Sequence, residues 1–447
     1  MSNKAHLTIG SVPDHLIKLA LPTLIGIVCT FSYIIADTYF ISLLGQSQLT
    51  AISYATPMID FIIGIAIGIA ISVSSIVARK IGANQFDQVR VYVLHAAMLC
   101  LIIAVIVIIL GISFIGLIFR SLGADNQIIS QIYNFMVIWY FGVFFLFMNF
   151  VSSSSLRAYG RAKGPAMILI ITAILNVMLD PIFMFVLHLG IMGAAVAGLI
   201  SSFLGFILLI RMLVKNSLIS FEVKKYLPLL YNSWKNIIAI TIPASLTNVI
   251  GPLASFWITY LLATSSQAAV AGFGVAAKAQ MIAVIPLFAV SASIGPIVGQ
   301  NYTANKIDRS FLALKICSVF AIVWGVLISI MLAIFAPYIS QVFSDDPQTI
   351  LSSNLYMYII PISYTGWGVI MMVCANFNSL GYPKRSTFIS FTRMIILFIP
   401  LSIILFHWFD YVGVYVAFSL ATFITAIFAY LWAHKDYSKI KPNFINH

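Results

Sequence analysis

Long apolar runs, separated by short polar stretches, repeat along the whole chain. A helix that crosses a bilayer needs about 20 mostly apolar residues. Twelve runs meet that length, and each polar stretch between them is too short to form a domain. The pattern predicts an all-α membrane protein with twelve transmembrane helices, near residues 16–43, 51–79, 92–119, 128–157, 166–187, 193–214, 236–261, 270–299, 311–336, 349–380, 387–407 and 412–434.

The two halves of the chain share a register. Pro22 matches Pro243 (243 − 22 = 221), and the same offset relates three further pairs of positions: Asn84 with Asn305, Asp87 with Asp308, and Gly160 with Gly381. The offset becomes 220 at Gly193 and Gly413. A constant register over so many residues indicates an internal repeat.

The most polar interior stretch, residues 215–235, divides the chain almost equally. We therefore expect an N-lobe of residues 1–220 with helices 1–6, and a C-lobe of residues 221–447 with helices 7–12. Six helices per half is an even number, so the two six-helix bundles should be pseudo-symmetric about an axis along the membrane normal. By analogy with transporters of that architecture, substrate would bind in a cleft between the lobes.

Composition and charge agree with a membrane protein. The 447 residues are 62% hydrophobic and 8% charged, too few charges to cover a water-facing surface. The net charge of +12 does not indicate nucleic acid, because the basic residues lie between apolar runs and not on one amphipathic face.

The basic residues also predict orientation. With a cytoplasmic N-terminus, the outer loops keep only Arg120 of all the Lys and Arg residues between the runs. Since Lys and Arg concentrate in cytoplasmic loops, we expect a multi-pass protein of the inner (cytoplasmic) membrane with both termini cytoplasmic. The residues placed inside are Arg79, Lys80, Arg90, Arg157, Arg161, Lys163, Arg211, Lys215, Lys224, Lys225, Lys235, Lys306, Arg309, Lys315, Lys384, Arg385, Lys435, Lys439 and Lys441.

Two aspartates lie at matching depth inside the first half. Asp37 is six residues before the outer end of the first run, and Asp180 is seven before the outer end of the fifth, which runs in the same direction. Asn176 and Tyr33 are each four residues from one of these acids, and so share its helix face. The sequence predicts a compact polar site inside the N-lobe.

Buried carboxyl groups give this site its expected chemistry. Desolvation favours the neutral form of a carboxyl group, and a second carboxylate nearby favours it further. Such a pair titrates as a coupled unit and could take up a proton or release it when water or a cation enters. The alternative is a buried pair that only fixes packing.

Other ionisable residues inside the runs are harder to assign. Asp60 could extend the site or face external water, and Lys278 could contact substrate in the cleft, pair with an acid or remain a neutral amine; we favour the cleft for Lys278. Arg393 should snorkel towards the cytoplasm. Pro22 permits a kink in helix 1, either static or one that lets the helix bend when Asp37 changes charge.

Catalytic signatures do not appear in the sequence. It contains no Walker A, HExxH or GxSxG motif. The four cysteines stand alone in apolar stretches and are expected to be packing residues. We expect a protein that is not an enzyme, has no cofactor or metal, and draws its energy from an ion gradient.

Several segments resemble the multidrug and toxic compound extrusion (MATE) transporters over essentially the whole chain. The resemblance rests on Leu21-Pro22 with Ala36-Asp37-Thr38, on residues 79–84 (RKIGAN), on residues 156–163 (LRAYGRAK) and on Asn176 through Asp180. It implies the V-shaped twelve-helix MATE fold and efflux of small molecules.

Within the family the chain is most similar to the DinF-like branch. That resemblance implies a proton or cation site at Asp37, Asp180, Asn176 and Tyr33, with bending of helix 1 around Pro22 in some members. The NorM-like branch instead uses acids in helices 7 and 10, and this sequence has none in either. A hydroxyl expected on helix 6 is replaced by Gly198, which argues against a tight Na⁺ site at Asp37, Asn176 and Asp180.

The resulting expectation is a monomeric, proton-coupled antiporter that exports amphipathic or cationic drugs through the lipid bilayer. Alternatives are Na⁺-coupled drug export and a lipid or glycan-lipid flippase of the same superfamily. A major-facilitator transporter is disfavoured because its signature after helix 2 is missing. A membrane-embedded enzyme would need a nucleophile or metal cluster that the sequence does not show.

Overall fold

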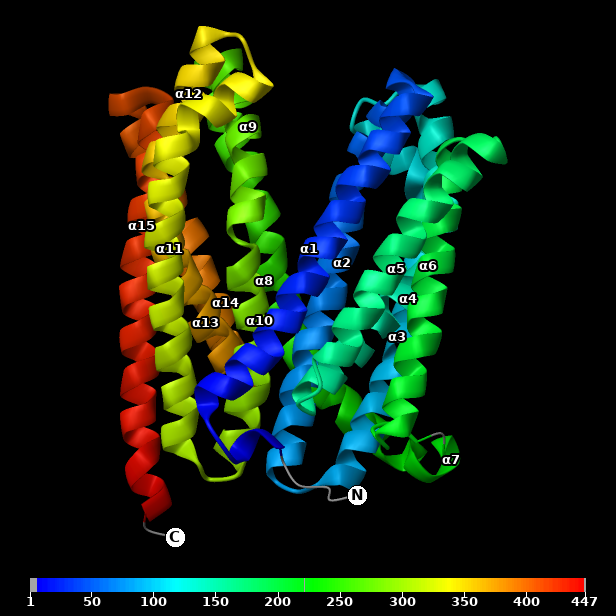
Figure 1. Ribbon diagram of the computed structural model, residues 1–447, viewed down its shortest axis with the longest axis vertical. Helices are drawn as coiled ribbons and strands as arrows, with labels where there is room; N and C mark the ends of the chain where they lie inside the picture. The colour runs from blue at the N-terminus through cyan, green and yellow to red at the C-terminus, as the bar shows by residue number, and fades with distance from the viewer. Residues whose placement is uncertain (1–5, 221, 446–447) are drawn as a thin grey trace. The chain divides into compact units, whose positions relative to one another are not determined.

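The structure, a computed structural model, describes residues 6–220 and 222–445. All regular elements in these residues are helices (Figure 1). In chain order these are η1 (His6–Thr8), α1 (Val12–Leu44), α2 (Gln46–Gly82), α3 (Phe86–Ser121), α4 (Asn126–Ala158), α5 (Lys163–Pro181), the π-turn η2 (Ile182–Val186), α6 (Ile191–Lys215), α7 (Val223–Tyr226), η3 (Leu227–Leu229), α8 (Leu230–Ser265), α9 (Gln267–Ala283), α10 (Ile285–Thr303), α11 (Ile307–Phe343), α12 (Pro347–Ile359), η4 (Pro361–Ser363), α13 (Tyr364–Leu380), α14 (Pro383–Phe391), the π-turn η5 (Thr392–Phe398) and α15 (Ile399–Ile445).

The number of membrane spans follows from helix length. Ten helices of the described chain are long and apolar enough to cross a bilayer, and the bent pair α9 and α10 makes an eleventh. One of the ten, Pro383–Lys439, is 57 residues long and contains a non-helical residue, Asp410 (φ 53°, ψ −145°). At 1.5 Å per residue that helix is nearly three times as long as a bilayer requires. Divided at Asp410 it supplies two spans, which confirms the prediction of twelve.

The internal repeat is visible in the backbone. Asn84 and Asn305, 221 residues apart, both have a φ of 59°, although a positive φ is uncommon for any residue but glycine. Gly160 and Gly381 also share the left-handed region, with φ values of 94° and 89°. The break at Asp410 corresponds, at an offset of 220, to Gly190 (φ 56°, ψ −136°), where α6 begins.

The chain separates into two compact units, whose division differs from the predicted boundary between residues 220 and 221. The first unit holds Lys18–Ser245, and the second holds Leu7–Ile17 and the chain from Leu246 onward. The start of α8 belongs to the first unit because Trp234 Nε1 donates to His95 O (2.9 Å), Asn236 Nδ2 to Tyr92 Oη (2.8 Å) and Ser72 Oγ to Ile237 O (2.8 Å).

The start of α1 belongs to the second unit for the corresponding reason. Arg309 on α11 donates to Gly10 O (2.7 Å), and Asn301 Nδ2 donates to Leu7 O (3.1 Å). Lys306 Nζ donates to Thr8 O (2.8 Å). The first helix of each repeat, α1 or α8, therefore begins in the unit formed mainly by the other repeat. No local sequence pattern predicts this exchange.

Each unit is built around central helices, with small residues where the helices approach closely. In the first unit α4 packs against α2, α3 and α6, and in the second α13 packs against α10, α11 and α15. A Cβ at Gly111 on α3 would lie 2.4 Å from the Tyr140 ring of α4, so only glycine fits there. Small residues allow such contacts between membrane helices.

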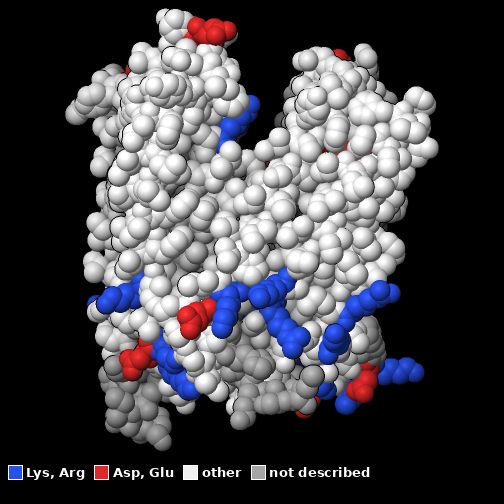
Figure 2. Space-filling view, in the orientation of Figure 1, with Lys and Arg blue, Asp and Glu red and all other residues white. Residues whose placement is uncertain are grey.

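The outward faces of the helices are apolar. On α3, Leu101, Val105 and Ile109 are each about half exposed, which suits contact with lipid chains. Figure 2 shows that most of the visible Lys and Arg side chains gather towards one end of each unit, while one basic group lies well away from that end and the broad sides are otherwise almost uncharged. We call this the basic end; it carries Arg79, Lys80, Arg157, Arg161 and Lys163 in the first unit, and Lys306, Arg309, Lys315, Lys384 and Arg385 in the second.

Candidate functional site

Helices α1 and α5 meet inside the first unit. They approach closely at Gly26, where a Cβ would lie 3.1 Å from Leu169 Cδ1 of α5. Further along both helices, the side chains of Asp37 and Asp180 are close enough to interact electrostatically, and Tyr33 interacts with both acids. The structure therefore brings together the two aspartates and the tyrosine that the sequence selected.

The oxygen atoms at this site lack hydrogen-bond donors. Asp180 is fully buried, and neither of its carboxyl oxygens has a partner among the described residues. The same holds for Oδ1 of Asp37 and for Oδ1 of Asn176, a residue that is 6% exposed. A buried polar atom without a partner is costly, and a buried charge more so. The arrangement suits uptake of a proton or a cation, which would supply the missing donor or counter-charge.

Helix α6 forms a further wall of the site. A Cβ built on Gly198 lies 3.9 Å from Nδ2 of Asn176, so the position where the family resemblance implies a hydroxyl does face the site but carries no oxygen. Ser201, one turn further along α6, is 4% exposed and its Oγ has no partner among the described residues. Sequence reasoning did not select Ser201; its spacing of three from Gly198 is the signal that could have found it.

Three other predicted residues lie apart from this polar cluster. Pro22 lies inside α1, which the structure assigns as one helix from Val12 to Leu44. Asp60 on α2 is exposed. Lys278 on α9 belongs to the second unit, is exposed, and has its Nζ 5.4 Å from the centre of the Phe343 ring.

The corresponding place in the second unit is apolar. The repeat mates of Asp37 and Asp180 are Ile258 and Leu401, and both belong to the hydrophobic core there. The two helices are joined by a neutral hydrogen bond instead, from Trp257 Nε1 to Ser402 Oγ (2.9 Å). Only the first unit has carboxyl groups at this level.

Arg393 contradicts the prediction that it snorkels. It is 8% exposed, and its Nε and Nη1 atoms have no hydrogen-bond partner among the described residues. Its Cζ lies 5.7 Å from the centre of the Trp367 ring. The residue occupies the π-turn η5, which alters the direction of its side chain relative to a regular helix. No pattern of residues in this segment predicts that turn.

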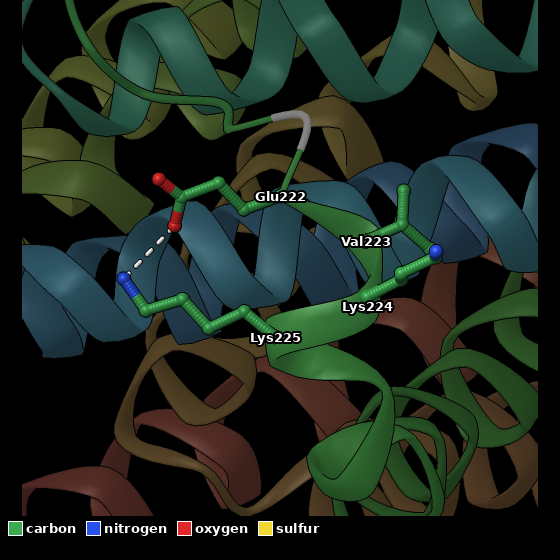
Figure 3. Close-up of a pocket in the computed structure, with 4 residues that line it drawn as sticks. All are labelled: Glu222, Val223, Lys224 and Lys225. Carbon is green, nitrogen blue, oxygen red and sulfur yellow. Dashed lines mark hydrogen bonds and ion pairs between the residues drawn. The ribbon is translucent and has the colours of Figure 1, made fainter.

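A shallow surface depression lies elsewhere, around α7 (Figure 3). It is lined by Glu222, Val223, Lys224 and Lys225, and Lys225 donates to Glu222 Oε2 at 2.9 Å. That hydrogen bond lowers the pKa of Glu222. Both side chains are more than half exposed, so the pair is an ordinary solvated one and offers no enclosed site.

The fold and the buried polar cluster are those of a multi-pass membrane transporter. Among the described residues no group of three or more His, Cys, Asp or Glu side chains could hold a metal ion. The MatE family profile matches residues 22–182 and again residues 243–404. The chain therefore belongs to the MatE family, and the two matches begin 221 residues apart, as the repeat requires.

Named relatives and a solved structure extend this result. The chain is 32% identical to the FAD transporter of Shewanella oneidensis, over 99% of this chain and 98% of that protein. It is 23% identical to the multidrug export protein MepA of Staphylococcus haemolyticus, over 94% and 93%. A MOP superfamily transporter from Pyrococcus furiosus shares the fold with a TM-score of 0.92 at 24% identity, covering 99% of both chains. The two relatives are named for transport and export.

Proposed function

We propose that this protein is an ion-coupled antiporter that exports small organic molecules from the cytoplasm, and that Asp37 and Asp180 form its coupling site. The observation that carries the proposal is the buried Asp180, whose two carboxyl oxygens lack donors beside a second acid and a tyrosine. Intramembrane acids are costly and usually functional.

Protons are the favoured coupling ion. A proton needs only the carboxyl oxygens, whereas Na⁺, a hard cation, needs a shell of several oxygen ligands. Gly198 leaves one wall of the site without such a ligand. Na⁺ is the alternative, and it would draw on Asp37, Asn176, Asp180 and the hydroxyl of Ser201.

Helix α1 is the mobile element in this proposal. In the 18-residue apolar stretch of α1, only 17% of the residues are buried, compared with 67% in the corresponding stretch of α2. Few packing contacts therefore resist movement of α1. Pro22 removes a backbone hydrogen bond from α1 between its start and Asp37. Protonation of Asp37 would remove a charge and let the helix change its bend at this point.

The substrate class has two candidates. One relative is named as a multidrug export protein. Its name supports the first candidate, amphipathic or cationic drugs, for which ethidium is a suitable probe. The relative at 32% identity is named for FAD, an aromatic anion. The basic ends of the units would lie in the cytoplasm, following the positive-inside rule.

The proposal is tested in proteoliposomes loaded with ethidium or FAD. A pH gradient of the correct sign should drive transport of one of them without Na⁺, and substrate addition should dissipate that gradient. Asp37→Asn should reduce both signals to background, whereas Asp345→Asn, the same change in an exposed loop, should leave them unchanged. Transport driven by Na⁺ alone, or an Asp37→Asn variant equal to wild type, would refute proton coupling.

A further inference from the structure

A buried arginine in the second unit has no acidic partner among the described residues of that unit. Arg393 is 8% exposed, and its Nε and Nη1 lack acceptors among the described residues. The nearby Trp367 ring contacts the guanidinium face, but a ring face does not accept both free N–H groups. π-turns of this kind are frequent at functional sites.

Acids of this unit cannot neutralise Arg393. Its six acidic residues, with Asp14 in the first turn of α1 among them, all lie towards the ends of helices or in loops. Asp436 pairs with Arg385, Asp410 accepts from Ser265 Oγ (2.7 Å), and Asp346 caps the start of α12. Asp308 lies in the first turn of α11, and Asp345 is exposed. Since guanidinium groups remain charged in proteins and none of these acids pairs with Arg393, a bound anion would supply the missing counter-charge.

Trp367, the ring beside the guanidinium, packs against two further aromatic side chains. Trp367, which is partly exposed, makes an edge contact with Phe288 (ring centres 6.4 Å apart), and Phe288 is 40% exposed. Tyr364, which donates to Gln280 Oε1 (3.2 Å), packs on the other side of Trp367. A planar ring can stack on such residues, and a guanidinium fork binds phosphate or carboxylate with two parallel hydrogen bonds.

We propose that Arg393 and Trp367 form an anion site in the second unit, which binds the phosphate group of an exported aromatic anion such as a flavin nucleotide. The proposal rests on the export function above and assigns its substrate class. In the first unit the mate of Arg393 is Thr172, so this basic position has no counterpart there.

Equilibrium binding to the purified protein, without any ion gradient, tests the site. FAD and FMN should bind about ten-fold more tightly than riboflavin, which has the same ring without phosphate. Arg393→Gln should remove that preference and leave riboflavin affinity unchanged, and Arg393→Lys should keep part of it. Arg211→Gln, at an exposed arginine of α6, is the matched control. Equal losses for FAD and riboflavin, or no preference in the wild type, would overturn the proposal.

Two further arms separate other sources of phosphate. Inorganic phosphate should compete with FMN only weakly, because it cannot stack; competition as strong as that of FMN itself would contradict the aromatic part of the site. The FAD preference should persist in bilayers of phosphatidylcholine. Arg393-dependent binding of phosphatidylglycerol in place of FAD would assign the site to lipid and contradict the proposal.

Failure of this inference is distinguishable from failure of the antiport proposal. Asp37→Asn should lose gradient-driven transport but retain the binding preference for FAD over riboflavin. Arg393→Gln should lose that preference. Loss of the FAD preference in Asp37→Asn, with its retention in Arg393→Gln, would contradict both the coupling site and the anion site.

Discussion

The two units carry the same fold but opposite intramembrane chemistry. The first has two acids without donors at the meeting of α1 and α5, and no Lys or Arg away from its helix ends. The second has Ile258 and Leu401 at the corresponding positions, and a buried arginine at a place where the first has Thr172. The two units thus hold different buried polar groups, and we propose that the first binds a coupling ion and the second an anionic substrate.

The largest expected effect on export comes from replacing the buried carboxyl group of Asp180 in the first unit. Asp180→Asn leaves the size of the side chain almost unchanged but cannot exchange a proton. Gradient-driven export in proteoliposomes should fall to background, while equilibrium binding of substrate is retained. Full transport by this variant would show that the acid is only a packing residue.

An acid placed at the corresponding position of the second unit should lower the stability of the protein and should not couple further protons to transport. Ile258 is 5% exposed in an apolar core, so Ile258→Asp should destabilise the protein by about 3 kcal/mol. The thermal unfolding midpoint of the purified protein measures this. Ile258→Val, which removes one methylene, should cost only about 1 kcal/mol. A stable Ile258→Asp protein with altered proton coupling would show that the units are functionally equivalent.

The neutral link of the second unit should contribute modestly. Trp257→Phe removes the donor to Ser402 Oγ, and hydrogen bonds between membrane helices average about 0.6 kcal/mol. A double-mutant cycle with Ser402→Ala isolates that energy from lost packing. A coupling energy of several kcal/mol would mean that this link, and not the apolar core, joins the two helices.

Substitution of Gly198 should have the smallest effect on stability. It should nevertheless change which ion drives transport. A Cβ at Gly198 would lie 3.9 Å from Asn176 Nδ2, so a serine side chain should fit there. Gly198→Ser should therefore change the free energy of unfolding by no more than about 0.5 kcal/mol. The added hydroxyl supplies an oxygen ligand, and transport should become responsive to Na⁺. Gly198→Ala is the control without oxygen. Equal Na⁺ responses in the two variants would remove Gly198 from the account of ion selection.

Sequence patterns predicted the parts of this molecule that depend on periodicity. Apolar run length predicted the spans, and the constant offset predicted the repeat, which the backbone shows at Asn84 and Asn305. Helix direction and depth predicted that Asp37 and Asp180 would lie together, since residues at one level of neighbouring parallel helices are brought close by packing.

Tertiary contacts determined the parts that were not predicted. The unit boundary after Ser245 depends on hydrogen bonds such as that from Trp234 to His95 O, between residues far apart in sequence. Arg393 looked like a snorkelling residue because its distance from the helix end allowed it. Arg393 instead lies buried in a π-turn, a rare element that the apolar pattern of the sequence does not predict.

Proton release on substrate binding tests the central claim most directly. Purified protein in weakly buffered solution with a pH indicator should release about one proton per bound substrate at neutral pH, because the coupled acids share one exchangeable site. Asp37→Asn combined with Asp180→Asn should release none and still bind. Binding without proton release in the wild type, or equal release by the double variant, would contradict a coupling site at Asp37 and Asp180.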